Sequence, residues 1–317
     1  MTTNTPITNY QLPITKIVIG TRKSALAMWQ TNYVSGCLRE AWPGLEIEIR
    51  PFVTKGDETQ AAGIPLPEIG GKGLFTWELE NALREDEIQI AVHSLKDLPV
   101  ADSEGLLIGA VPQRANVQDV IVGQNGWTLE ALPRGAVVGT GSKRRAAQLL
   151  AVRPDLEIRS IRGNVGTRMR KVLEDQLYDG TVLAAAGLER LEETENISEY
   201  LSLDVMLPAP GQGALGVQCS EENEAVQTLL DKLHDQETYL AVTAERAFLS
   251  GLGGGCSAPV AAFAEVDAGE IFLQGLVASP DGLQMIRVRG EGGDPFELGE
   301  RLAQEALGMG AGEIVNN

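Results

Sequence analysis

Strand-like and helix-like segments alternate along the first two thirds of the chain, and this alternation constrains the fold more than any other feature. The apolar segment KIVIG (16–20) is followed by apolar residues at helical spacing up to Ala41, and then by the alternating segment LEIEIRPFV (45–53). The same order returns at 132–188 without a sequence repeat. Such alternation is typical of parallel sheets joined by crossover helices, so we predict two α/β units.

Each α/β unit is predicted from short apolar runs and helical periodicity. The predicted elements of the first are strands at 16–20, 45–53 and 88–95, with helices up to Ala41 and at 74–83. Those of the second are a strand and a turn at 132–142, strands at 156–163 and 181–188, and helices at 143–152 and 165–176.

The last third of the chain predicts a smaller α+β unit. A Pro/Gly-rich crossing and a strand cover 207–220, and a helical stretch at about 222–250 has a break near Asp235. Three predicted strands follow at 258–266, 270–279 and 283–292, and a final helix at about 296–309.

Composition excludes several classes of protein. The 317 residues include 26 Lys and Arg against 44 Asp and Glu, for a net charge of −18, which argues against a general nucleic-acid-binding surface. No run approaches the roughly 18 apolar residues that predict a membrane span. The first 15 residues lack the charged and apolar regions of a signal peptide. We expect a cytoplasmic protein with a disordered N-terminal tail.

The cysteines differ in their surroundings. Three widely spaced cysteines do not form a disulfide framework, and without a CxxC motif or clustered histidines no zinc site is predicted. Cys37 lies on an apolar helical stripe and Cys219 ends a strand, so both are predicted to be core residues. Cys256, in LGGGCSAPV (252–260), has little to pack on and no histidine near it in sequence. It is either a turn residue or a point of covalent attachment.

Several arginines and lysines lie at predicted helix starts, although the chain as a whole is acidic. GTGSKRR and RGNVGTR each follow a strand and begin a helix, where free N–H groups favour anions, and IGTRKSALA (19–27) has the same design. Arginine adds a bidentate fork for carboxylate or phosphate. The arginines predicted to bind an anion at the carboxyl ends of strands are Arg22, Arg144, Arg145, Arg162 and Arg168. Those predicted to lie on a solvated helix face are Arg153, Arg159 and Arg170.

Two further patterns bear on function. AVHSLKDLPV (91–100) places Lys96 and Asp97 directly after a strand, and the carboxylate is either a poised acid or base or a helix N-cap beside a surface lysine. GQGALG (211–216) matches GxGxxG but precedes a strand, so it does not predict a dinucleotide site. GGKGLF (70–75) lacks the Ser/Thr and the spacing of a phosphate loop.

Together the motifs resemble those of the hydroxymethylbilane synthases, also called porphobilinogen deaminases. The resemblance runs from about Ile17 to Val315 and rests on IGTRKSALAMWQT, VTKGDE, GGKGLFTWELENAL, IAVHSLKDLP, VVGTGSKRRAAQL, IRGNVGTRMRK, AAAGLERL, LPAPGQGALGVQC and AERAFLSGLGGGCSAP. It implies an enzyme of tetrapyrrole biosynthesis. Such an enzyme joins four porphobilinogen molecules head to tail, releases four ammonia, and hydrolyses the product off as hydroxymethylbilane.

The resemblance also implies roles for single residues. Cys256 would carry a dipyrromethane cofactor through a thioether, and Asp97 would be the catalytic aspartate, which stabilises positive charge on the pyrrole nitrogen when ammonia leaves. The residues implied to bind the cofactor are Ser24, Lys72, Lys96, Thr140, Ser142, Arg144, Arg145, Arg162 and Arg168. Those implied to bind the substrate are Arg22, Ser24, Arg162, Arg168 and Arg190. Gly141 and Lys143 depart from the family motif, which predicts altered ligand affinity.

The implied fold has three domains. The first two resemble periplasmic binding proteins with a cleft between them, and the third is a small α+β domain that carries the cysteine loop. The expected limits are 14–112 with 213–231, then 117–207, then 236–317, since the chain of this family returns to the first domain after the second. We expect a monomer with no metal and with neither nucleic acid nor membrane as a partner.

Two other functions fit part of the pattern. A two-lobed binding protein for an anionic small molecule would explain the arginines, but it would need neither Cys256 nor Asp97 and usually carries a signal peptide. A ligand-sensing regulator would bring a DNA-reading module, and the sequence shows no basic recognition helix. Ammonia release from porphobilinogen separates the enzyme from both.

Overall fold

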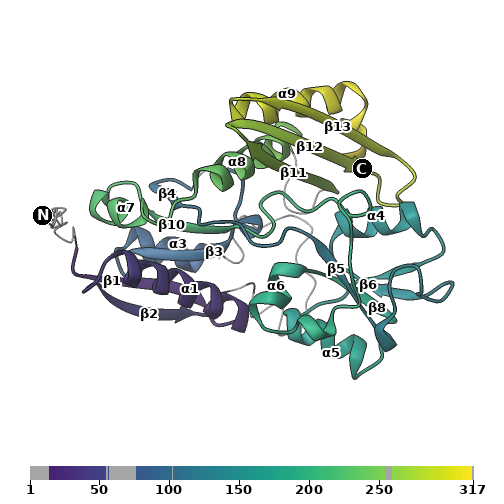
Figure 1. Ribbon diagram of the computed structural model, residues 1–317, viewed down its shortest axis with the longest axis horizontal. Helices are drawn as coiled ribbons and strands as arrows, with labels where there is room; N and C mark the ends of the chain where they lie inside the picture. Colours follow the sequence, from purple (N-terminus) through teal and green to yellow (C-terminus); the bar gives the residue numbers. More distant parts are fainter. Residues whose placement is uncertain (1–13, 55, 57–75, 102, 254–258, 316–317) are drawn as a thin grey trace, which may run out of the picture.

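The computed structural model describes residues 14–54, 56, 76–101, 103–253 and 259–315. Most of the predicted N-terminal tail, Lys72 and Cys256 lie outside these residues. The described chain forms three sheets, each with its own helices (Figure 1). Within the described ranges, no helix has the length and apolar character that a membrane span requires.

The first sheet has five strands in the order β2-β1-β3-β10-β4. Its strands are β1 (Lys16–Arg22), β2 (Glu46–Phe52), β3 (Ile90–Ser94), β4 (Leu106–Ala110) and β10 (Leu215–Ser220). Its helices are α1 (Ala25–Ala41), α3 (Trp77–Arg84) and α7 (Glu224–Leu230). Alternate β1 residues, Ile17 and Ile19, are fully buried and pack with Val34 and Leu38 of α1, as the two periodicities predict.

The second sheet repeats this layout in the order β7-β6-β8-β5-β9. Its strands are β5 (Asp119–Gly123), β6 (Val137–Gly139), β7 (Glu157–Arg159), β8 (Gly180–Ala184) and β9 (Glu199–Tyr200). Its helices are α4 (Lys143–Val152), α5 (Val165–Leu173) and α6 (Ala185–Arg190), with short 3₁₀ turns at Gln124–Gly126 and Thr194–Asn196.

Two sequence predictions are wrong in detail. The predicted strand at 181–188 ends at Ala184, and the chain continues as α6. A short buried run cannot be assigned by periodicity alone, and Ala185 and Ala186 favour a helix. The sheets are also mixed instead of parallel, because β10 and β5 run antiparallel to both of their neighbours.

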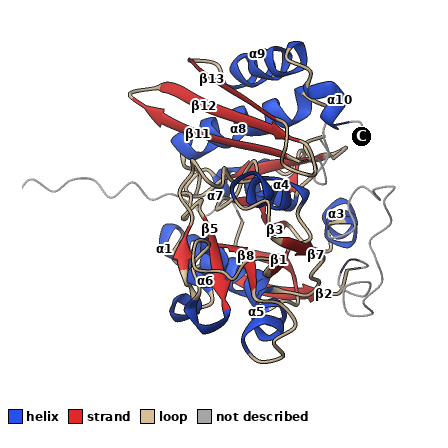
Figure 2. Ribbon diagram, turned by 90° about the vertical axis from the view of Figure 1, so that its right-hand side faces the viewer, coloured by secondary structure: helices blue, strands red, loops and turns tan. Residues whose placement is uncertain are grey.

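The third unit is a three-stranded antiparallel sheet of β11 (Val260–Asp267), β12 (Glu270–Ala278) and β13 (Met285–Gly292). It packs with α8 (Gln236–Gly251), α9 (Pro295–Gly308) and α10 (Ala311–Val315), as Figure 2 shows. A side chain at Gly275 would overlap the buried ring of Phe248, so glycine lets α8 lie close to the sheet. The predicted break near Asp235 is the N-cap of α8, where its carboxylate accepts from the Thr238 N–H at 2.8 Å.

The chain crosses between the first two sheets twice, at 111–118 and at 201–214 (Figure 1). The third unit lies over both crossings, with α8 nearest to them. The prediction of two α/β units and a smaller α+β unit is confirmed. This arrangement brings the carboxyl end of β3, the start of α4 and the start of β11 close together.

Candidate active site

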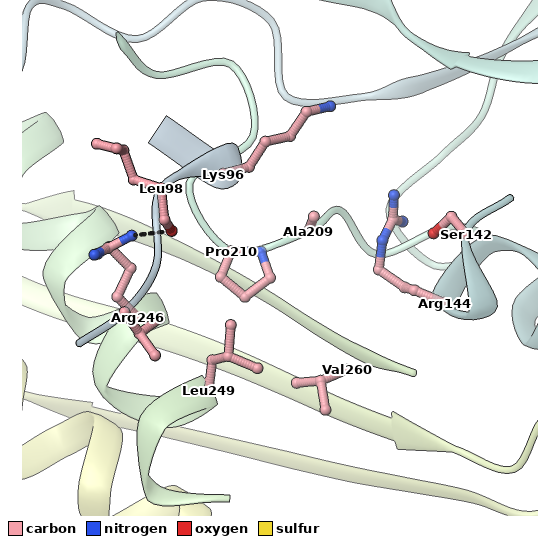
Figure 3. A pocket seen from close by; sticks show the side chains of 10 residues that line it. Lys96, Leu98, Ser142, Arg144, Ala209, Pro210, Arg246, Leu249 and Val260 are labelled. Carbon is pink, nitrogen blue, oxygen red and sulfur yellow. Dashed lines mark hydrogen bonds between the residues drawn. The ribbon is translucent and has the colours of Figure 1, made fainter. Parts of the chain in front are cut away.

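A cavity of about 60 Å³ lies where the three units meet, and we call it the junction cavity (Figure 3). It is lined by Lys96, Leu98, Val100, Ser142, Arg144, Ala209, Pro210, Arg246, Leu249 and Val260. Lys96 comes from a 3₁₀ turn, η1 (Leu95–Asp97), directly after β3, and Arg144 comes from the first turn of α4. Arg246 on α8 donates to the carbonyls of Leu98 (3.2 Å) and Pro99 (2.6 Å), which ties the third unit to this turn.

Beside the junction cavity, the paired arginines hold a buried carboxylate that the sequence reasoning missed. Asp119, the first residue of β5, is fully buried, and it accepts from Arg144 Nη1 at 2.8 Å and from Arg145 Nη2 at 2.7 Å. Burial alone would raise the pKa of Asp119, but the two guanidiniums outweigh it and hold that pKa well below its ordinary value. The two arginines therefore carry an internal counterion.

Arg144 and Arg145 use their donors differently. Arg145 donates to Asp119 through Nε (3.2 Å) and Nη2 (2.7 Å), and to the Val182 carbonyl through Nη1 (2.8 Å). Arg144 donates only through Nη1, to Asp119 (2.8 Å) and the Leu207 carbonyl (2.7 Å). Among the described residues its Nε and Nη2 have no hydrogen-bond acceptor, so this edge of the guanidinium is available at the cavity.

Lys96 belongs to the same network. Its Nζ donates to Gln212 Oε1 at 3.1 Å, and Gln212 Nε2 donates to Asp119 at 3.0 Å. Burial and the charge of Arg145 lower the pKa of Lys96 to about 8, while Asp97 and Asp119 oppose the shift. Lys96 is half-buried, so the alternative of a surface lysine is wrong.

Asp97 faces a different space, which we call the Asp97 cavity. It measures about 70 Å³ and is lined by Arg22, Ser24, Leu26, Ala27, Gln30, Thr76, Val92, His93, Ser94 and Asp97. Asp97 ends η1, so the turn directs two successive residues to the two cavities. Arg22 ends β1, and Ser24 caps α1 by accepting from the Ala27 N–H at 3.3 Å.

The remaining predicted cations lie on the second unit. Arg168 on α5 is within electrostatic reach of Arg145, Arg162 and Asp97, and burial and the two arginines lower its pKa to about 10. Arg190, at the end of α6, is buried; it donates to the Gly213 carbonyl at 2.8 Å and stacks on Trp29 of α1 at 5.6 Å.

The turn before α4 is built as its sequence predicts. Ser142 caps the helix by accepting from the Arg145 N–H at 3.4 Å, and its own N–H donates to Thr140 Oγ1 at 3.1 Å. Gly141 and Lys143, the two departures from the family motif, are exposed.

Two cysteines were predicted to lie in the core and three arginines on a solvated helix face, and the structure agrees with part of this. Cys219 is buried, which raises the pKa of its thiol to about 11, whereas Cys37 is only partly buried against the core of the first unit. Arg159 and Arg170 are exposed and pair with acidic neighbours, but Arg159 lies on a strand instead of a helix. Arg153 is half-buried instead of solvated, because it donates to Asp155 and to the Leu129 and Leu132 carbonyls. Over the described ranges no group of three His, Cys, Asp or Glu side chains could hold a metal ion.

Comparison with known proteins assigns most of the chain. Residues 17–228 match the family described as "Porphobilinogen deaminase, dipyromethane cofactor binding domain", and residues 239–308 match "Porphobilinogen deaminase, C-terminal domain". A porphobilinogen deaminase of Brevibacillus brevis is 47% identical over 298 residues, covering 94% of this chain and 96% of the relative. One of Pelotomaculum thermopropionicum is 48% identical over 302 residues, covering 95% and 96%. A nutrient binding protein from Burkholderia cenocepacia aligns with a TM-score of 0.41 at 13% identity, covering 68% of this chain and 89% of that one.

Proposed function

Because this chain belongs to the porphobilinogen deaminase family, we propose that the junction cavity and the Asp97 cavity together form its active site. The enzyme condenses four porphobilinogen molecules head to tail on a dipyrromethane cofactor, releases four ammonia, and hydrolyses the product off as hydroxymethylbilane. This reaction belongs to tetrapyrrole biosynthesis. The cofactor supplies a covalently held pyrrole end on which the chain of rings grows.

The donor set of the junction cavity fits this cofactor. A dipyrromethane bears acetate and propionate groups, and carboxylates need fixed cations when they leave water. Arg144 offers an edge without an acceptor, and Lys96 offers the ammonium donors that Gln212 does not use. Val260 lines the same cavity and lies four residues after Cys256. This cationic cavity, which Val260 also lines, is the observation that carries the proposal.

We assign the cofactor thioether to Cys256 on this basis. The residues proposed to hold the carboxylates of the cofactor are Ser24, Lys72, Lys96, Thr140, Ser142, Arg144, Arg145, Arg162 and Arg168. Arg145 keeps one N–H on each of Nη1 and Nη2 for this role, since Asp119 and the Val182 carbonyl take its other donors. Lys72 is assigned by its motif alone.

Asp97 is the proposed catalytic residue. The carboxylate of Asp97, which lines the Asp97 cavity, would stabilise the positive charge that develops on the pyrrole nitrogen as ammonia leaves. The same carboxylate would carry protons to the leaving amine and from the newly joined carbon. Arg22, Ser24, Arg162, Arg168 and Arg190 would bind the acetate and propionate groups of the incoming porphobilinogen.

Three finer points belong to the same proposal. The domains run over 14–112 with 213–231, over 117–207 and over 236–317, and the strands of one sheet fall within each. The enzyme works in the cytoplasm, with a small-molecule substrate and without nucleic acid. It works as a monomer, which light scattering of the purified protein tests.

The experiment is an intact mass of the purified protein beside Cys256→Ser, with Cys37→Ser as the matched control. We expect an increment of two porphobilinogen units less two ammonia in the wild type and in Cys37→Ser, and none in Cys256→Ser. If the wild type shows no increment even after incubation with porphobilinogen, and releases no ammonia, a two-lobed binding protein for an anionic molecule becomes the better description.

A further inference from the structure

Asp119 accepts four hydrogen bonds from donors of the chain itself. Its carboxylate accepts from Arg144 Nη1 (2.8 Å), Arg145 Nη2 (2.7 Å), Arg145 Nε (3.2 Å) and Gln212 Nε2 (3.0 Å). It is fully buried, and Gln212 is fully buried as well. Because both oxygens are engaged by the chain and the carboxylate is fully buried, we do not assign a ligand to Asp119 itself.

Three cations share this one buried carboxylate. Arg144 and Arg145 contact Asp119 directly, and Lys96 reaches it through Gln212. Positive charges that are held around one carboxylate repel one another strongly where water is excluded. Without Asp119 the three positive charges would face one another, and the other carboxylate that acts on Lys96 is Asp97, which faces the Asp97 cavity.

The contacts also orient the two guanidiniums. Asp119 and the Val182 carbonyl engage all three nitrogens of Arg145, while Asp119 and the Leu207 carbonyl fix Arg144 by Nη1 alone. Arg144 lines the junction cavity, and its Nε and Nη2 have no acceptor among the described residues. These nitrogens are the ones that we propose for a ligand carboxylate.

We propose that Asp119 is a positioning residue that fixes the paired arginines and, through Gln212, the lysine of the junction cavity. The inference rests on the proposed function, since the cations that Asp119 fixes are those that would bind the cofactor carboxylates. The hydrogen bonds of the network form between residues of the chain and need no cofactor.

The protonation of Lys96 tests this network without any assay of turnover. The charged groups that face it are Arg144, Arg145, Asp97 and Asp119. If Asp119 acts through its charge, its removal leaves Lys96 beside two uncompensated arginines, so the amine loses its proton more easily. If Asp119 only supports the local fold, its removal opens the site to water, and the amine holds its proton more tightly. The two roles therefore predict opposite directions.

The test is competitive acetylation of the full-length protein at pH 6, with Lys96 labelling measured by mass spectrometry relative to the exposed Lys143. In Asp119→Asn, Lys96 is expected to label roughly tenfold faster than in the wild type, because a tenfold change in the acidity of a mostly protonated amine changes its reactive fraction tenfold. Gln212→Met removes the acceptor of Lys96 and one donor to Asp119 but leaves both arginines on that carboxylate, so it is expected to change labelling in the same direction by less. Slower labelling in Asp119→Asn, or unchanged labelling in both variants, overturns the proposal.

The same comparison is made in a Cys256→Ser background. The effect of Asp119→Asn is expected there too, because no bound cofactor is needed for it. Failure to find the cofactor increment would thus count against the proposed function alone, while loss of the labelling effect in both backgrounds would count against the role of Asp119 alone.

Discussion

One buried carboxylate joins three parts of the molecule, and its loss should be measurable. Glu245 on α8 is fully buried and accepts from Arg114 Nη1 at 2.7 Å and Nη2 at 3.0 Å. It also accepts from the Gly211 N–H at 2.7 Å and from the Ala264 N–H at 2.8 Å. Both crossings and the third sheet therefore meet at Glu245.

Replacing Arg114 by methionine would leave this carboxylate with two backbone donors and no counterion. Hydrogen bonds to charged groups contribute about 1.5–3 kcal/mol each, so the two lost from Glu245 amount to about 3–6 kcal/mol. Removal of one partner from a buried pair typically costs about 3–5 kcal/mol, in agreement with that sum. We expect Arg114→Met to lower the free energy of unfolding by about 4 kcal/mol and Tm by on the order of 10 °C.

Urea denaturation and calorimetry measure this effect, and a second substitution isolates its cause. Glu245→Gln removes the uncompensated charge, so Arg114→Met/Glu245→Gln should be more stable than Arg114→Met alone. The matched control is Arg159→Met, which breaks the exposed pair with Glu157 and should cost less than about 1 kcal/mol. The reasoning is refuted if Arg114→Met costs no more than this control, or if the double variant loses the sum of the two single losses.

Three other substitutions test the site and the crossings. Asp97→Asn should nearly abolish ammonia release while leaving the circular dichroism spectrum and Tm unchanged; substantial steady-state turnover would remove Asp97 from the catalytic role. Because the pKa of Lys96 is about 8, its positive charge is lost as pH rises through that value, so kcat/KM should fall above about pH 8. Lys96→Arg keeps the charge and should lose this alkaline limb, and an unaltered limb would assign it to another group. Gly213→Ala should destabilise the protein by about 2 kcal/mol or more in urea denaturation, since φ is +85° and the added carbon would lie 2.6 Å from the Ala115 carbonyl oxygen; a wild-type midpoint would contradict the strain.

Local patterns were sufficient to predict most helices and strands. The helix predicted at 143–152 has these limits in the structure, because Ser142 caps its start and Ala147 and Leu149 are buried. The sequence reasoning missed β4 and β5, which are short and pair antiparallel with distant segments. Their partners are set by the crossings, and no local signal encodes those.

The site was predicted as a set of cations but not as a network. Helix-start patterns indicated Arg144 and Arg145, yet their counterion Asp119 precedes them by about 25 residues. Asp119 directly precedes the apolar run VIVG, and this position indicates a buried carboxylate that needs a cationic partner. Nothing in the sequence indicates which cation that partner is. Gln212 lies in a loop of the second crossing, where its role depends entirely on tertiary contacts.

The position of β10 in the first sheet has a consequence for synthesis on the ribosome. All strands of the second sheet lie between residues 119 and 200, whereas the first sheet needs β10, at 215–220, between β3 and β4. The emerging chain can thus complete its middle portion while its beginning still waits for a missing central strand. Nascent β3 and β4 expose unpaired edges during that interval, and such edges favour association with other chains. A pause in translation that holds residues 215–220 inside the ribosome after residue 200 has emerged would prolong this state, and slow codons at that point should lower the yield of folded enzyme.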